Sequence, residues 1–173
     1  MLGIAAALLL GAAATTWYVV GDADGRDTDA SPVAVERPFK PTATAAAGQP
    51  VTDGALQYVI NSIECGRSTT GDGGPTAEGQ FCLVTVEATN VGSEPRTFDA
   101  SYQWAVDGAG ERHPADTTAS LYANQNGETF LRDLVPGAEV SGVLVFDVPE
   151  GQTIVSVELH ESPDSTGAAV AAR

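Results

Sequence analysis

The sequence predicts an all-β domain, an antiparallel β-sandwich, that follows an apolar N-terminal segment and a polar linker. From Val51 onward, short runs rich in Val, Ile, Thr, Phe and Tyr alternate with clusters of Gly, Pro, Asp and Asn, as strands alternate with turns. Runs at this spacing are typical of a sandwich or a barrel. No long apolar pattern with the period of a helix lies between Val51 and Glu161, so we expect little helix there.

Two of the expected strands show clear alternation between an inner and an outer face. In the run FCLVTVEATN, the side chains from Cys82 to Ala88 at even positions form an apolar face, and those between them are mostly polar. In the run VSGVLVFDV, Phe146 and its neighbours at even positions are expected to point inward. The full set of expected strands is Leu56–Glu64, Phe81–Asn90, Arg96–Val106, Glu128–Leu131, Val140–Val148 and Thr153–Glu161.

Turn residues separate these runs. The segment Asp107 to Gly110 (DGAG) predicts a hairpin between YQWAV and the short segment ERH. Pro136-Gly137 suits a turn that opens a new strand, because Pro presets φ and Gly accepts a positive φ. The segment GRSTTGDGGPTAEG, residues 66–79, predicts a long flexible loop.

The two cysteines, Cys65 and Cys82, predict one disulfide bond in an oxidising compartment. In the chain-entropy description such a bond stabilises the fold by roughly 3 kcal/mol. It would close the base of the loop 66–79. Two free buried thiols are the alternative, whereas a metal site would need further ligands nearby, which the sequence lacks.

Residues 1–21 predict a transmembrane anchor or a signal peptide. Leu2–Val20 is uncharged and has about the length of a helix that crosses a bilayer. Small residues up to Ala14 suit cleavage of a signal peptide, whereas the run stays apolar and aromatic through Val20 and so favours a single-pass anchor, and both remain open. The basic segment expected before either is missing. We therefore expect the domain on the outer side of the cell membrane, or secreted.

The remaining boundaries follow from composition. Residues 22–50 are rich in Pro, Ala and Asp and lack periodicity, which predicts a disordered linker. Such a linker would hold the domain at a distance from the membrane. Residues 51–162 form the expected sandwich. Residues 163–173 are small and polar, which predicts a disordered tail.

The charge excludes two classes of partner. The chain of 173 residues has 23 Asp and Glu against 8 Lys and Arg, a formal net charge of -15, and most of the acidic residues lie in the expected sandwich. A nucleic acid or an anionic membrane surface requires a basic face, which this composition does not supply. We expect a self-repelling domain, hence a monomer, and a neutral or basic partner.

Three ordered segments resemble a known family. QFCLVTVEATNVGSEPRTF, VDGAGERH and LVPGAEVSGVLVFDVPEG are similar to successive patterns of the exported telokin-like, immunoglobulin-like family named domain of unknown function 4352. The resemblance covers about Val51 to Glu161 and implies an immunoglobulin-like fold in an envelope or extracellular setting, without an established common activity. The matching residues are Gly79, Phe81, Val84, Val86, Asn90, Gly92, Asp107, Gly110, Leu134, Pro136, Gly137, Gly142, Phe146, Val148 and Pro149.

One departure from antibody-type domains affects the disulfide. In those domains a Trp lies between the two cysteines in sequence, whereas Trp104 follows both here. The bond is therefore expected to staple a neighbouring strand or a loop base rather than the centre of the sandwich. Trp104 is expected to be a core or half-buried aromatic residue.

The sequence gives little support to an enzyme. His113 and His160 are the only histidines, and we expect both at the surface. The motifs of Ser hydrolases, P-loop proteins and zinc proteases are missing. We therefore expect no catalytic, cofactor-binding or metal-binding residues, although an acid-catalysed hydrolase with an unrecognised pair of carboxylates is a formal alternative.

The leading functional hypothesis is a non-catalytic interaction module. It would contact a protein or a glycan of the cell envelope or the extracellular space, and the alternative is a secreted inhibitor or antigen-like effector released by cleavage of the signal peptide. Aromatic and amide side chains suit adaptable recognition, so the segment LYANQNGETF and Tyr102 form a candidate binding edge, with Tyr102, Trp104, Tyr122 and Asn124 as its candidate ligand residues.

Overall fold

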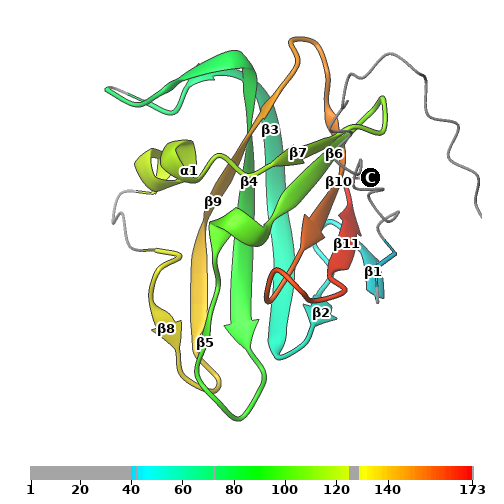
Figure 1. Ribbon diagram of the computed structural model, residues 1–173, viewed down its shortest axis with the longest axis vertical. Coiled ribbons are helices and arrows are strands. Elements are labelled where there is room, and N and C mark those ends of the chain that lie inside the picture. Colours follow the sequence, from blue (N-terminus) through cyan, green and yellow to red (C-terminus); the bar gives the residue numbers. More distant parts are fainter. Residues whose placement is uncertain (1–39, 42, 72, 125–128, 173) are drawn as a thin grey trace, which may run out of the picture. The chain divides into compact units, whose positions relative to one another are not determined.

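The computed structural model describes residues 40–41, 43–71, 73–124 and 129–172, which form two β-sheets that face each other across one core (Figure 1). The five-stranded sheet has the spatial order β1 (Ala43–Ala46), β11 (Ala168–Ala171), β10 (Ile154–Leu159), β6 (Trp104–Asp107) and β7 (Arg112–Pro114). The four-stranded sheet has the order β2 (Val51–Asp53), β3 (Leu56–Thr69), β4 (Thr76–Asn90) and β9 (Glu139–Val148). All neighbouring strands pair antiparallel except β1 and β11, which are parallel.

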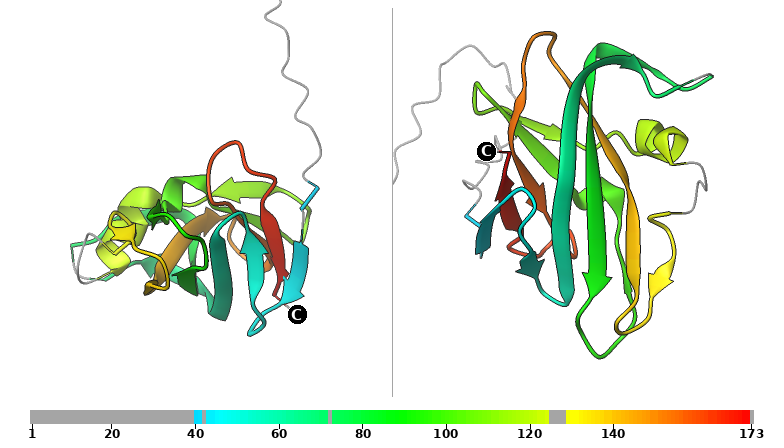
Figure 2. Two further views of the ribbon diagram at one scale, coloured as in Figure 1. Left: turned by 90° about the horizontal axis from the view of Figure 1, so that it is seen from below. Right: turned by 180° about the vertical axis from the view of Figure 1, so that it is seen from behind.

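Shorter elements cover one open side of the sandwich. The chain leaves β4 into a two-stranded ribbon of β5 (Arg96–Thr97) and β8 (Asp133–Leu134). Between these two strands in sequence lie the 3-10 helix η1 (Ala100–Tyr102) and the helix α1 (Thr117–Ala123). Figure 2 shows α1 from two further directions, beside the four-stranded sheet. The prediction of an all-β sandwich is confirmed.

The core follows the predicted alternation. On β4 the side chains at even positions from Cys82 to Ala88 are fully buried, and on β9 those of Leu144, Phe146 and Val148 are buried opposite them. Apolar alternation in a strand buries one face because successive side chains point to opposite sides. The inner faces of both sheets thus form one continuous core.

A second, smaller apolar cluster lies on the outer face of the four-stranded sheet. Phe81 on β4 and Val145 on β9 pack there against Ala119 of α1. The sequence predicts little helix, but α1 forms because Asp116 caps its first turn, accepting a hydrogen bond from the N–H of Ala119 at 2.8 Å. Its two turns are too short to show a helical period, so only packing against β4 and β9 decides this element.

Cys65 and Cys82 form the predicted disulfide bond. The two residues lie on adjacent strands, β3 and β4, so the bond staples neighbouring strands. Both strands continue past it, and Thr69 still pairs with Thr76. The predicted flexible loop 66–79 is therefore wrong for most of its length, because backbone pairing extends the hairpin where the side chains are polar and show no alternation.

Two predicted strands are not formed as such. The run Arg96–Val106 is split into β5, η1 and β6, because Asp99 accepts a hydrogen bond from the N–H of Ser101 and turns the chain. Residues 129–131 of the run Glu128–Leu131 form a turn before β8, while Glu128 lies outside the described residues.

The limits of the domain are also wider than predicted. The expected disordered tail 163–173 contains β11, whose Ala168 and Val170 are fully buried. The expected linker 22–50 ends in β1, which pairs with β11. Small alanine side chains carry no strong strand signal, and pairing of these two segments with each other and with β10 decides their structure.

The segment predicted as an anchor or signal peptide, residues 1–21, and linker residues 22–39 lie outside the described part of the chain. Within that part, no helix is long and apolar enough to cross a membrane.

Candidate functional site

The open side of the sandwich beside β9 is closed by α1, which is fastened to the strand edge by side chains. The N–H of Val145 donates to Ser120 Oγ at 2.9 Å. Asn124 binds Val143 twice: its Oδ1 accepts from the Val143 N–H at 2.9 Å and its Nδ2 donates to the Val143 carbonyl at 2.8 Å. Ser120 and Asn124 are four residues apart and so lie on the same face of the helix. They extend the backbone contacts that begin at this edge with the bridge between Ala115 and Phe146 and with the hydrogen bond from the Asp116 N–H to the Val145 carbonyl, 2.8 Å.

The 3-10 helix η1 forms the opposite wall and is held by two side chains. Asp99 accepts a hydrogen bond from the N–H of Ser101 at 2.8 Å through its Oδ1. The buried amide of Gln103 donates to the carbonyls of Asp99 and His160 at 2.7 and 3.0 Å. These bonds fix η1 between the two sheets.

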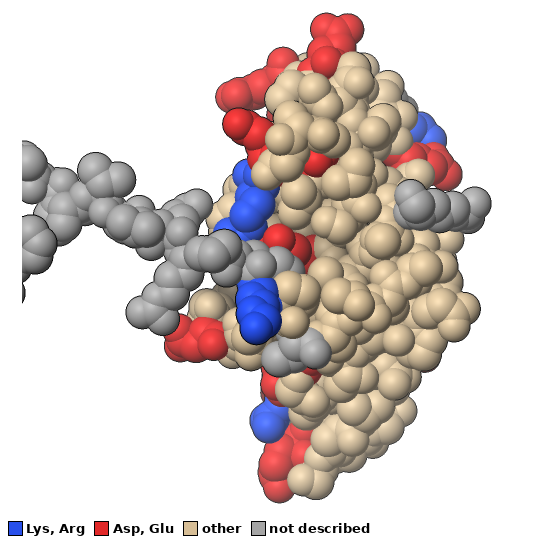
Figure 3. All heavy atoms as spheres, turned by 90° about the vertical axis from the view of Figure 1, so that its right-hand side faces the viewer, with Lys and Arg blue, Asp and Glu red and all other residues tan. Residues whose placement is uncertain are grey.

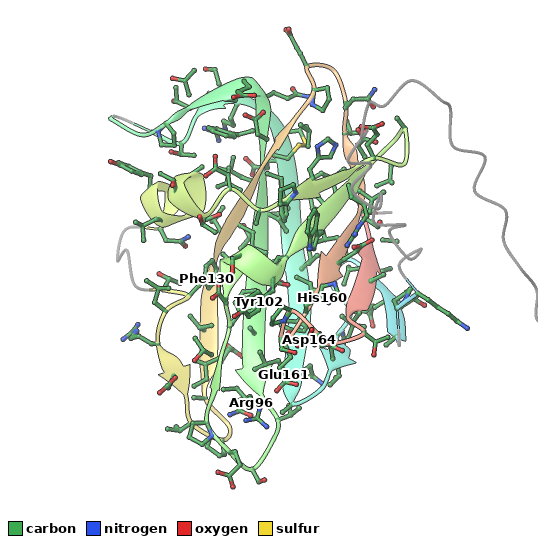
Figure 4. The ribbon with its side chains drawn as sticks, viewed as in Figure 1. Arg96, Tyr102, Phe130, His160, Glu161 and Asp164 are labelled. Carbon is green, nitrogen blue, oxygen red and sulfur yellow. A yellow bond between two sulfur atoms is a disulfide. The ribbon has the colours of Figure 1, made fainter. Side chains whose placement is uncertain are left out.

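Phe130 forms the floor between these walls. Its ring lies edge-on to that of Phe98, with centroids 5.0 Å apart, and Phe98 in turn contacts Tyr58 in the core. Figure 4 labels Phe130 and, on η1, Tyr102. A Cβ atom on Gly142 of β9 would lie 2.5 Å from Phe130 Cζ, so the glycine provides the space that the ring occupies.

A cavity of about 240 Å³ lies between α1, η1 and residues 129–131. Among the described residues its surface combines apolar side chains, hydroxyl groups and one amide with a single ionisable side chain, that of Asp99. Such a surface suits non-covalent recognition of a small apolar group. The lining residues are Asp99, Ala100, Thr117, Thr118, Ser120, Leu121, Asn124, Thr129, Phe130 and Leu131.

Exposed apolar side chains border the same place. Leu121, which lines the cavity, is 46% exposed and Leu131 is 64% exposed, while Tyr122 on the same helix is 56% exposed. Aromatic and large aliphatic side chains of this kind are the usual anchors of protein interfaces.

The four residues of the predicted ligand edge do not form one surface in the structure. Asn124 lines the cavity, but its amide is engaged by β9. Tyr122 is exposed on α1, and Tyr102 is half-buried on η1; neither lines the cavity. Trp104 is half-buried on β6, as predicted, with the guanidinium carbon of Arg112 4.5 Å from its ring centroid.

The segment LYANQNGETF, residues 121–130, contributes Leu121, Asn124, Thr129 and Phe130 to the cavity, whereas the sequence analysis missed the lining residues of η1 and of the start of α1, above all Ala100 and Thr118. One signal was present: Asp116 followed by Thr-Thr-Ala is a typical helix start. Residues 125–128 of the quoted segment LYANQNGETF lie outside the described residues.

A second, larger cavity of about 770 Å³ lies between the start of β4, the end of β7 and residues 147–150. It is lined by four acidic residues, but two of them bind backbone. Asp147 accepts hydrogen bonds from the N–H groups of Glu78 and Gly79 at 2.6 and 3.1 Å, and Asp116 caps α1. These acids therefore hold the fold together, and no group of three metal-ligating side chains occurs within the described ranges.

His113, which also borders this cavity, contacts Asp107 rather than facing solvent. Its Nε2 lies 3.0 Å from Asp107 Oδ2, while Asp107 Oδ1 accepts from the N–H groups of Ala109 and Glu111 at 2.9 Å each. The bond from His113, followed by that from Glu111, lowers the pKa of the Asp107 carboxyl. The predicted DGAG hairpin is thus confirmed, and a buried aspartate organises it.

The lower end of the sandwich in Figure 4 holds a third group of polar residues. Buried Asp53 accepts from the N–H groups of Glu161 and Gly167 at 2.9 and 3.0 Å, and Glu161 forms an ion pair with Arg96 at 2.6 Å. Burial and these two carboxylates raise the pKa of Tyr58 far above its usual range. The expectation of a surface His160 is wrong, since it is 8% exposed and packs over Gly167.

Comparisons with known proteins agree with this fold. The model of the family described as "Domain of unknown function (DUF4352)" matches residues 45–170. The chain belongs to the DUF4352 family. The match begins in β1 and ends in β11, so these strands are part of the DUF4352 domain. A comparison with curated proteins gives no match.

Solved structures share the sandwich at low identity. The yjhA protein of Bacillus subtilis is 14% identical, with 75% of this chain and 99% of that chain covered and a TM-score of 0.53. MPT63, a secreted protein of Mycobacterium tuberculosis, is 16% identical, with 76% and 98% covered and a TM-score of 0.55. A functionally unknown protein of Listeria monocytogenes is 10% identical, with 73% and 82% covered and a TM-score of 0.51. At these identities the similarity concerns the fold alone.

Proposed function

We propose that this DUF4352 protein is a non-catalytic interaction module that works outside the cytoplasm and binds a protein or glycan of the cell envelope through the cavity between α1 and η1. The observation that carries the proposal is the cavity itself: an apolar floor, a rim of hydroxyl groups and exposed Leu121 and Leu131 beside it. Such a surface offers an anchor point for a partner.

The extracytoplasmic setting is supported by two observations. The Cys65–Cys82 disulfide is the kind of bond that persists in oxidising compartments. The sandwich is also shared with MPT63, which is described as secreted. The uncharged run Leu2–Val20 would keep the domain at the membrane. Mass spectrometry of the native N-terminus tests this point, because a mature chain that starts near Thr15 would contradict the anchor.

The net charge of the chain limits the class of partner that it can bind. On the face shown in Figure 3, Asp and Glu are most numerous at the top, Lys and Arg are interspersed with further acidic residues, and a broad area carries no charge. The net charge of the chain, -15, favours a neutral or basic partner. If charge contributes to binding, raising the salt concentration should weaken it.

Crosslinking in intact cells followed by purification of the full-length protein tests the proposal. Leu121→Gln removes an apolar contact at the cavity, and Val155→Gln on β10 is the matched control because both side chains are 46% exposed and Val155 does not line the cavity. We expect capture of the same partner by the wild type and by Val155→Gln, and reduced capture by Leu121→Gln. Equal capture by all three proteins would contradict the assignment of the cavity.

A further inference from the structure

We infer that the cavity between α1 and η1 binds one apolar side chain of a protein partner together with a neighbouring Lys or Arg, which pairs with Asp99. This inference rests on the proposed function and makes its partner specific: a basic peptide segment rather than a glycan. Three properties of the cavity lead to it, namely its size, its apolar floor and the carboxylate of Asp99.

The size of the cavity limits the occupant to one side chain or one ring. An apolar cavity of about 150 Å³ is enough for benzene, and sites for drug-sized ligands span about 300–1,000 Å³. At about 240 Å³ the cavity lies between these values. A leucine or phenylalanine side chain therefore fits, whereas an oligosaccharide or a cofactor does not.

The floor of the cavity selects an apolar group. Ala100 and Phe130 are 8% and 7% exposed, and Leu121 and Leu131 stand at the rim. The amide of Asn124, which could recognise sugar hydroxyls, is already engaged by Val143. Polar groups of a ligand would thus meet mainly threonine hydroxyls, while its apolar part would displace water from Phe130.

Asp99 selects a cation beside this apolar group. Its carboxylate accepts one hydrogen bond from a described residue, that from the Ser101 N–H to Oδ1. Among the residues that the structure describes, no Lys or Arg lines the cavity and no cation forms an ion pair with Asp99. An anionic ligand would be repelled here, and an ammonium or guanidinium group would be attracted.

The test uses short blocked peptides and the full-length protein in detergent micelles. The probes are acetylated, amidated tetrapeptides with the central pairs Phe-Lys, Phe-Glu and Ser-Lys, and methyl β-glucoside represents a glycan. NMR shifts of the methyl groups of Ala100, Leu121 and Leu131 report occupancy of the cavity. We expect the Phe-Lys peptide to bind most tightly and the Phe-Glu and Ser-Lys peptides to bind more weakly.

Asp99→Asn isolates the charge, because asparagine keeps the oxygen that caps η1. We expect Asp99→Asn to weaken binding of the Phe-Lys peptide about two- to fivefold, the range of a partly exposed ion pair. Its affinity for the Phe-Glu peptide should be unchanged or higher. Asp164→Asn is the matched control, because it removes one exposed negative charge from a residue that does not line the cavity. It should change neither the affinity for the Phe-Lys peptide nor that for the Phe-Glu peptide.

Equal binding of Phe-Lys and Phe-Glu, or shifts caused by the glucoside instead, would overturn the inference. A lack of shifts with every peptide would also overturn it. Both results leave the proposed function intact if Leu121→Gln still captures less of the partner than the wild type does in the crosslinking experiment. The proposed function is contradicted if capture is the same in Leu121→Gln and the wild type.

Discussion

Gly142 on β9 and Phe130 occupy complementary positions: the ring of Phe130 fills the space that a side chain on residue 142 would need. The first atom of such a side chain would lie 2.5 Å from Phe130 Cζ, 2.7 Å from Thr129 Cγ2 and 2.8 Å from Asn124 Oδ1. Because residue 142 has no side chain, the Phe130 ring and the Asn124 amide, which bonds to Val143, can both pack against this part of β9. It is also one of the glycines on which the sequence resemblance rests.

Gly142→Ala is therefore expected to destabilise the protein by about 1–3 kcal/mol, the usual cost of overpacking. The added methyl group must displace the Phe130 ring or the Asn124 amide. Thermal unfolding followed by near-ultraviolet circular dichroism measures the change. Gly108→Ala is the control, because a Cβ atom there would meet its nearest neighbour, Gln152 Oε1, at an ordinary 3.6 Å; an equal loss in both variants would contradict the packing argument.

Asn124→Ala should release α1 from the edge of β9. Both Val143 hydrogen bonds to the amide are lost, and unsatisfied backbone groups cost about 1–3 kcal/mol when they stay buried. We expect faster hydrogen exchange at the Val143 N–H. Asn61→Ala, at an exposed position of β3, is the matched control and should leave this exchange rate unchanged. Unchanged exchange in Asn124→Ala would show that the helix is held by other contacts.

Asp107 should make stability depend on pH on the acid side. Its pKa is lowered in the folded state, so its contribution is complete above the ordinary aspartate pKa of about 3.9 and is lost as the pH falls through the folded-state value. The difference in unfolding free energy between the wild type and Asp107→Asn should be constant above about pH 5 and shrink below about pH 4. Chemical denaturation across this range measures it. A difference that grows toward low pH would reverse the assigned sign.

Removal of the disulfide should weaken the fold without abolishing it. The double substitution Cys65→Ala and Cys82→Ala is expected to cost about 2–5 kcal/mol. Pairing of β3 with β4 on both sides of the bond should keep the hairpin in place, so the far-ultraviolet circular dichroism spectrum should stay close to that of the wild type. Peptide mapping without reductant checks the bond directly, and alkylation of both cysteines without prior reduction would contradict it.

The long strands could be predicted from the sequence because their burial is one-sided. On β4 and β9 the inward positions are apolar and the hairpin and turn residues mark their ends, so both the strands and their inner faces follow from alternation. The hairpin at Asp107 follows in the same way from its turn residues. The disulfide follows from the even number of cysteines together with the expectation of an oxidising compartment.

The candidate site could not be predicted in this way. Asn124 is predicted only as an adaptable polar side chain and Ser120 not at all, and their hydrogen bonds to β9 arise only where α1 packs beside that strand. Phe130 is predicted to lie in a strand, Glu128–Leu131, but residues 129–131 form a turn, and the position of the ring depends on the missing side chain of Gly142. Ala168 and Val170 become core residues only through pairing of β11 with β1 and β10.

The sequence by itself thus determined the class of fold, the paired cysteines, the acidity and the family, because turn chemistry, side-chain alternation and composition are local properties. Only the tertiary structure decided three features, namely the helix on the outer face of the four-stranded sheet, the alanine-rich strands β1 and β11, and the cavity between α1 and η1. These features arise from contacts between segments far apart in sequence, such as Gly142 with Phe130 and Asp53 with Gly167, whose energies no local pattern encodes.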